Sequence, residues 1–169
     1  MKTAGDVSTK SWNVGMGELY RARPPEKLYT LGLGSCLALV FYDTRAEVAA
    51  MAHIMLPKSP ANGKETEKPG KFADTAIPRL LEVLEEAGAE RRRIRAKVAG
   101  GAKMFNIASS SPLMAIGQQN IQAVKEGLKA HGIPLEAEDT GGSRGRSVTF
   151  DTTSWKLQVK TLGEGIKVL

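Results

Sequence analysis

The sequence predicts a single mixed α/β domain with largely antiparallel sheets. Its length of 169 residues suits one domain that is large enough to bury a core. A composition of 41% hydrophobic and 25% charged residues is typical of a soluble globular protein. The apolar segments follow the order several strands, helix, strand, helix and further strands. That order indicates a mixed α/β domain and argues against a doubly wound nucleotide-binding fold.

The first part of the chain is expected to be rich in strands. Small and polar residues at its start predict a flexible tail over residues 1–13, ahead of one domain over 14–169. Strand-length apolar runs follow, separated by Pro24-Pro25, by a glycine turn and by the DTRA turn. These runs are WNVGMGELYRA, KLYTLGL, CLALVFYD and EVAAMAHIMLP, at 12–22, 27–33, 36–43 and 47–57.

A long loop and a helix are expected next. The stretch KSPANGKETEKPG at 58–70 is rich in proline and glycine and almost free of apolar residues, so it predicts either an active-site flap or a surface excursion. Leucines and an isoleucine at helical spacing then predict a helix within 72–89. Its regular part is expected from Ala76, with Pro78 in the first turn and Gly88 as the stop.

The helical pattern recurs at 120–132, where Asn120 is the expected N-cap and Gly132 the expected end. Its predicted apolar stripe consists of Ile121, Val124 and Leu128. Strands are expected on both sides of this helix, in RIRAKVAGGAKMF, IPLEAEDTGG and the hairpin RSVTFDTTSWKLQVKTL, at 93–105, 133–142 and 146–162.

The charge and the cysteine content of the chain restrict the kinds of function that the sequence is compatible with. The net charge is +6, and its densest part is RRRIRAK at 91–97. This run continues into VAGGA without interleaved aromatics, so it indicates the exposed start of a buried strand rather than a nucleic-acid patch. The single cysteine excludes an internal disulfide and a cysteine-rich zinc site. With no apolar leader in MKTAGDVSTKSW, a cytoplasmic protein without metal or cofactor is expected.

The single cysteine, Cys36, follows three small residues in GLGSCL. A dinucleotide loop would need a third glycine at the position of Leu37, and it would open a helix rather than a strand. Two interpretations stay open. Cys36 is either a buried filler on a glycine turn or a nucleophile held on a sharp turn.

A nucleophilic thiol needs a base, and the chain has two histidines. His131 is expected at an exposed helix end, whereas His53 interrupts a core-type strand and needs a partner there. Pairing around the DTRA turn would set Cys36 opposite His53, which favours the catalytic interpretation. Thr30 could then hold the other ring nitrogen of His53, and the turn at Gly34 and Ser35 could supply an oxyanion hole.

Five motifs in order resemble the chemoreceptor glutamine deamidase family CheD. They are TLGLGSC at 30–36, AMAHIMLP at 50–57, KPGKFADTAI at 68–77, AKVAGGAKMF at 96–105 and AEDTGGSRGRSV at 137–148. The resemblance implies a layered αββα sandwich similar to the catalytic domain of the cytotoxic necrotizing factors. It also implies a Cys36–His53–Thr30 triad that hydrolyses glutamine side chains on chemoreceptor helices through a thioester, in chemotaxis adaptation.

The family also implies the phosphatase CheC as a partner. Where the family usually has I-G-x-R-N, this chain has IGQQN, with Gln119 in place of the arginine. Two glycine pairs, Gly100-Gly101 and Gly141-Gly142, are interpreted either as a receptor or CheC surface or as plain turn glycines. Phe105 is interpreted either as an exposed anchor for such a partner or as a core residue. Two other functional classes remain: a docking regulator that is not catalytic, and a cysteine peptidase with the same triad.

Overall fold

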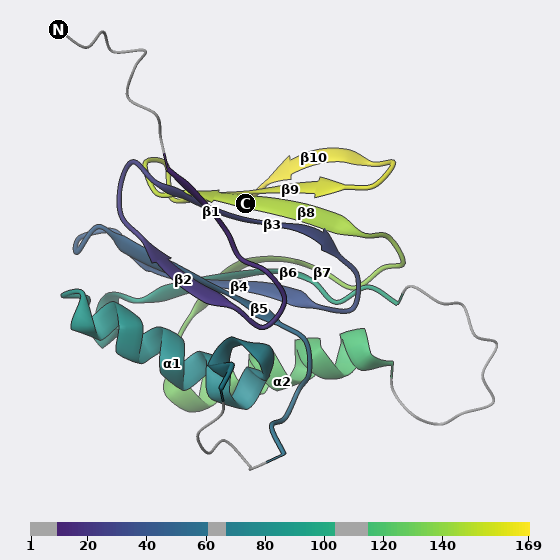
Figure 1. Cartoon of the computed structure of the whole chain (residues 1–169), viewed down its shortest axis with the longest axis horizontal. Coiled ribbons are helices and arrows are strands. Elements are labelled where there is room, and N and C mark those ends of the chain that lie inside the picture. Colours follow the sequence, from purple (N-terminus) through teal and green to yellow (C-terminus); the bar gives the residue numbers. More distant parts are fainter. Residues whose placement is uncertain (1–9, 61–66, 104–114) are drawn as a thin grey trace, which may run out of the picture.

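The computed structural model describes residues 10–60, 67–103 and 115–169. Within these residues two five-stranded sheets pack face to face, and two helices cover the outer face of one sheet (Figure 1). The predicted mixed α/β class in a layered, largely antiparallel sandwich is therefore confirmed. Both helices lie on the same side, so the described layers are helices, sheet and sheet. The remaining sheet face carries polar side chains, such as the exposed Lys156, Gln158 and Lys160, and needs no helical cover.

The outer sheet has the strand order β1-β3-β8-β9-β10. Its first pair, β1 and β3, is parallel, and the other three pairs are antiparallel. The strands are β1 (Ser11–Asn13), β3 (Lys27–Leu33), β8 (Arg146–Asp151), β9 (Lys156–Thr161) and β10 (Gly165–Val168). The sequence predicted β3 with these bounds and the β8–β9 hairpin, but it did not predict β10.

The central sheet has the order β2-β5-β4-β6-β7, with only β6 and β7 parallel. Its strands are β2 (Leu19–Ala22), β5 (Val48–Ile54), β4 (Leu37–Asp43), β6 (Arg95–Gly100) and β7 (Leu135–Thr140). Every residue of β4 and β5 is buried, because one face meets the helices and the other meets the outer sheet. Burial on both faces explains why these strands are near-continuous apolar runs rather than alternating ones.

The segment 12–22 was expected to be one strand but contributes two, one to each sheet. Residues Ser11–Asn13 form β1, so a strand lies inside the expected flexible tail of 1–13. Trp12 explains this start, since its ring stacks on Tyr20 and its indole N–H donates to Glu26 at 3.1 Å. Between β1 and β2 the chain crosses from one sheet to the other.

Helix α1 spans Ala73–Glu86 and begins earlier than expected, so Pro78 lies inside it rather than in its first turn. The preceding chain supports this early start, because the Ala73 N–H donates to the carbonyl of Leu56 at 3.0 Å. The predicted stop is confirmed: Gly88 follows the helix with a φ of 100°.

Helix α2 spans Ile116–His131 and ends, as predicted, at Gly132 in the left-handed conformation. Asn120 is the fifth residue of this helix and not its N-cap. The buried stripe is Gly117, Asn120, Val124 and Leu128, while Ile121 is only partly buried. An asparagine thus occupies a core position, and the functional site explains why.

The basic run at 91–97 starts with a short 3-10 helix, Arg91–Arg93, ahead of β6. Arg93 pairs with the fully buried carboxylate of Asp43 at 3.0 Å. Lys97 is buried and donates to the carbonyl oxygens of Trp155 and Leu169. These contacts agree with the prediction of a strand start.

Candidate functional site

Cys36 lies on the bend between β3 and β4, one residue before β4 begins. Its side chain is half-buried and packs against the core between the two sheets. A backbone hydrogen bond fixes this turn, since the carbonyl oxygen of Cys36 accepts the N–H of Gly101 at 3.0 Å. A partly accessible sulfur on a firmly held turn is compatible with a nucleophile.

The observed register places Ala38, not Cys36, directly opposite His53. The observed register differs from the expected one by two residues, because Asp43 still belongs to β4 and pairs with Val48. The Asp43 side chain accepts the N–H groups of Arg45 and Ala46 at 3.0 and 3.1 Å and so holds a four-residue turn. A shift of two residues keeps every side chain on its face, so Cys36 becomes a diagonal neighbour of His53 instead of a direct one.

His53 projects from β5 toward the outer sheet and is almost fully buried. Its Nδ1 lies 2.9 Å from the hydroxyl oxygen of Thr30, which comes from β3 of that sheet. The same nitrogen lies 3.2 Å from the carbonyl oxygen of Val14. Because a carbonyl can only accept, these contacts favour a proton on Nδ1 and a lone pair on Nε2. The expected contact between Thr30 and His53 is present.

Burial shifts the pKa values of both Cys36 and His53. It raises the pKa of the Cys36 thiol. It lowers the pKa of His53, while the Val14 carbonyl and the Glu18 carboxylate partly oppose this shift. Both directions favour a resting pair of neutral thiol and neutral imidazole. Such a pair reacts when the imidazole takes the thiol proton, which is general-base chemistry.

The turn before Cys36 is fixed through its carbonyl oxygens. The N–H of Ala102 donates to Gly34 at 2.9 Å, and the side-chain amide of Asn120 donates to Ser35 at the same distance. The backbone N–H groups of Ser35 and Cys36 have no hydrogen bond to any part of the chain that the structure describes. They are therefore available to a ligand, as an oxyanion hole requires.

Asn120 is the residue at this site that the sequence patterns missed. It is completely buried, and its Nδ2 donates to Ser35 at 2.9 Å and to the carbonyl of Met55 at 3.1 Å. Asn120 thereby ties the segment before Cys36 to the segment after His53. Its Oδ1 has no partner among the described residues. A polar residue four positions before Val124 and eight before Leu128 was the signal that could have found it.

We expect Asn120→Ala to lower the free energy of unfolding by about 2 to 3 kcal/mol, because two buried carbonyl groups lose their donor. Urea unfolding measures this loss. Gln122→Ala is the matched control, since that amide lies exposed on the same helix and donates to Glu126 one turn further along it. The control should change stability by less than about 0.5 kcal/mol. Equal stabilities of the two variants would contradict the assigned role of Asn120.

The glycine pairs bond to the turn that carries Cys36 and to each other. Gly101 donates to Cys36, and the N–H of Gly141 donates to the carbonyl of Gly100 at 2.9 Å. The carbonyl of Gly142 accepts the N–H of Lys103 at 2.8 Å. The close backbone approach at Gly100 is that of Cys36 itself. Whether a partner also docks at these glycines stays a prediction.

The remaining predictions concern residues outside this site. Phe105 lies outside the residues that the structure describes, as do 61–66 of the expected flap. His131 ends α2, and its Nδ1 lies 2.9 Å from the carbonyl oxygen of Gly127, away from Cys36. Within the described ranges no group of acidic, cysteine or histidine side chains could hold a metal ion. None of the described helices is long and apolar enough to cross a membrane.

Comparison with known proteins agrees with the motifs. A family model described as CheD chemotactic sensory transduction matches residues 55–161, more than half of the chain. This chain belongs to the CheD family. The match begins just after His53, so Thr30, Cys36 and His53 themselves precede the matched segment.

CheD relatives align over nearly the whole chain. A probable chemoreceptor glutamine deamidase CheD of Clostridium novyi is 45% identical over 92% of this chain and 96% of its own length. The chemoreceptor glutamine deamidase CheD of Halalkalibacterium halodurans is 47% identical over 91% of this chain and 95% of its own length.

The fold is also found beyond CheD proteins. A solved Neisseria meningitidis protein of the DUF152 family superposes with a TM-score of 0.50, over 86% of this chain and 76% of that protein. At 9% sequence identity this likeness concerns the fold alone.

Proposed function

We propose that this chain deamidates glutamine side chains of chemoreceptors, with Cys36 as nucleophile, His53 as base and Thr30 as the residue that orients His53. The two CheD relatives are described as chemoreceptor glutamine deamidases, one of them as probable. The chemistry fits the class of residues at the site, because a thiol with a neighbouring histidine can form an acyl-enzyme from an amide.

The hydrogen bonding of His53 is the observation that carries the mechanism. Its Nδ1 contacts Thr30 of β3 and the carbonyl of Val14, whose own N–H donates to Tyr29 of the same strand. Since these contacts hold the proton on Nδ1, Nε2 is the nitrogen left to act as a base. Cys36 is the only thiol in the chain, and it lies on the same face of the central sheet.

The reaction then has two halves. In the first, Nε2 takes the thiol proton and the sulfur attacks the carboxamide carbon of the glutamine, while the N–H groups of Ser35 and Cys36 hold the oxyanion. The C–N bond breaks as His53 gives its proton to the leaving ammonia, and a thioester remains. In the second half, His53 takes a proton from water, hydroxide attacks the thioester, and glutamate and the free thiol are released.

The setting follows from the substrate. Chemoreceptor helices that carry the glutamines extend into the cytoplasm, so we place the protein there. A CheC-type phosphatase is the second partner that we propose. It would act by occupying the receptor-binding surface and should therefore inhibit deamidation.

The test is to incubate the full chain with the cytoplasmic helical fragment of a chemoreceptor from the same organism. Intact mass, peptide mapping and an ammonia assay are read together. We expect conversion of particular glutamines to glutamate, with one ammonia released per conversion and the receptor backbone intact. Cleavage of the backbone would instead identify a cysteine peptidase. Receptor that stays unchanged by all three readouts would contradict enzymatic activity of either kind.

A further inference from the structure

Glu18 faces His53 across the edge of the central sheet. The β2–β5 register pairs Leu19 with Ala52, and its continuation pairs Glu18 with His53. The His53 N–H donates to the carbonyl of Glu18 and the Gly17 N–H donates to the carbonyl of His53, each at 3.0 Å, so Gly17 and Glu18 together lie opposite His53. Directly opposite residues share a face, so the Glu18 side chain lies on the same side of the sheet as the imidazole.

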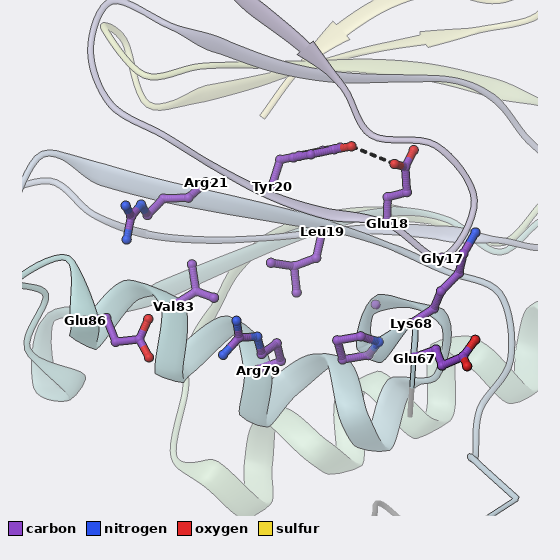
Figure 2. A pocket seen from close by; sticks show the side chains of 12 residues that line it. Gly17, Glu18, Leu19, Tyr20, Arg21, Glu67, Lys68, Arg79, Val83 and Glu86 are labelled. Atoms are coloured by element: carbon purple, nitrogen blue, oxygen red, sulfur yellow. Dashed lines mark hydrogen bonds between the residues drawn. The ribbon is translucent and has the colours of Figure 1, made fainter. Parts of the chain in front are cut away.

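The Glu18 carboxylate is held by two donors. Oε2 accepts the hydroxyl of Tyr20 at 2.6 Å, and Oε1 accepts the N–H of Gly15 at 2.9 Å. Figure 2 shows Glu18 and Tyr20 on one face of β2, with Leu19 on the opposite face. Gly15 immediately follows Val14, whose carbonyl contacts Nδ1 of His53. The carboxylate therefore also closes the turn that presents this carbonyl to the imidazole.

The carboxylate is charged at neutral pH. The Tyr20 hydroxyl lowers the pKa of Glu18, burial opposes this, and the Gly15 N–H and the nearby Lys68 lower it further. Glu18 is the charged group that acts on His53 among the described residues. The other titratable groups around the pair are Tyr20 on β2, Lys68 ahead of α1, and Cys36 on the turn before β4. None of these supplies a second negative charge at neutral pH.

We propose that Glu18 is a positioning residue for His53, and that its negative charge stabilises the imidazolium formed when the thiol proton is transferred. The inference rests on the proposed function, because it concerns the base of that reaction. A buried imidazole that must become charged needs a compensating charge nearby, and the partly buried Glu18 carboxylate supplies one. Thr30 and Val14 cannot supply it, because a hydroxyl and a carbonyl are neutral.

The experiment compares the full chain with its Glu18→Gln variant. Glutamine keeps the shape and the acceptor oxygen but loses the charge. The ring protons of His53 are titrated by NMR, and His131 in the same spectrum is the internal reference. We expect the pKa of His53 to fall by about one unit and that of His131 to stay unchanged. On receptor fragment, kcat/KM should fall roughly tenfold, and the acid limb of its pH profile should move to lower pH.

Glu86→Gln is the matched control. Glu86 and Glu18 line the same surface groove of about 560 Å³ between β2 and α1 (Figure 2), but Glu86 is exposed on the helix. The control should leave both the His53 titration and the pH profile unchanged.

Two outcomes would overturn the inference. One is a His53 titration that Glu18→Gln leaves unchanged in a folded protein. The other is a rate loss without any shift of the acid limb, which would assign Glu18 a purely structural role. If Glu18→Gln unfolds, Tyr20→Phe removes one donor and keeps the charge, and its His53 pKa should then stay within a few tenths of a unit. Because the NMR titration needs no receptor, it tests Glu18 even if the chain does not deamidate receptors.

Discussion

Cys36→Ala should lose receptor deamidation by roughly 10³-fold or more while it keeps the fold and receptor binding. The sulfur forms the covalent bond in the proposed mechanism, and no other thiol can replace it in this chain. The structural cost should be small, because the side chain is half-buried and loses a single heavy atom. Intact mass of a receptor fragment measures turnover, and co-sedimentation with the same fragment measures binding.

The two histidines supply the control for this prediction. His53→Gln should lose activity to a similar extent, since nucleophile and base act as a unit. His131→Gln should be as active as the wild type, because the hydrogen bond of His131 is to Gly127 of its own helix and not to the residues around Cys36. The enzyme hypothesis would be wrong if Cys36→Ala restored chemotaxis in a deletion strain as well as the wild type does. The chain would then act as a docking regulator.

Strands with a strong local pattern could be predicted from the sequence, and their register could not. The apolar run over 37–43 and its neighbour over 48–54 were identified correctly because both faces are buried. The predicted register of these two strands was wrong by two residues. The observed register depends on the hydrogen bonds of the Asp43 side chain in the turn and on Glu47, which takes a positive φ of 53°. A positive φ at a glutamate is uncommon, so the pattern gave no sign of it.

The site could be predicted in part for the same reason. Cys36, His53 and Thr30 stand out because a polar or reactive side chain interrupts an apolar or glycine-rich run. Val14 does not, since it acts through its backbone carbonyl. The helical spacing marks Asn120 as a polar residue on a buried stripe, but it does not show that Asn120 reaches Ser35 across 85 positions of the sequence. Such contacts follow from how the sheets and α2 pack and leave little trace in a local pattern.

Gly100→Ala should combine a loss of stability with a loss of activity, because Gly100 packs against the turn that carries the proposed nucleophile Cys36. Gly100 has a φ of 118°, and an added Cβ would overlap the carbonyl oxygen of Cys36. That same carbonyl accepts the Gly101 N–H at 3.0 Å, so relief of the overlap requires the backbone to move at Cys36 or at the strand end that holds it. A displacement of about 1 Å at a reacting group can lower the rate by about 10²-fold.

Gly88→Ala is the control that separates the effect of the steric overlap from the effect of the positive φ. Gly88 has a comparable φ of 100°, but an added Cβ there would meet no atom within 4 Å. Both variants carry the cost of a positive φ, about 1 to 2 kcal/mol. Gly100→Ala should lose about 1 to 3 kcal/mol more in urea unfolding, because its new methyl overpacks a filled space. It should also lose about 10²-fold in kcat/KM per folded molecule, whereas Gly88→Ala keeps full activity. Full activity of folded Gly100→Ala would show that the exact position of the Cys36 backbone does not limit the reaction.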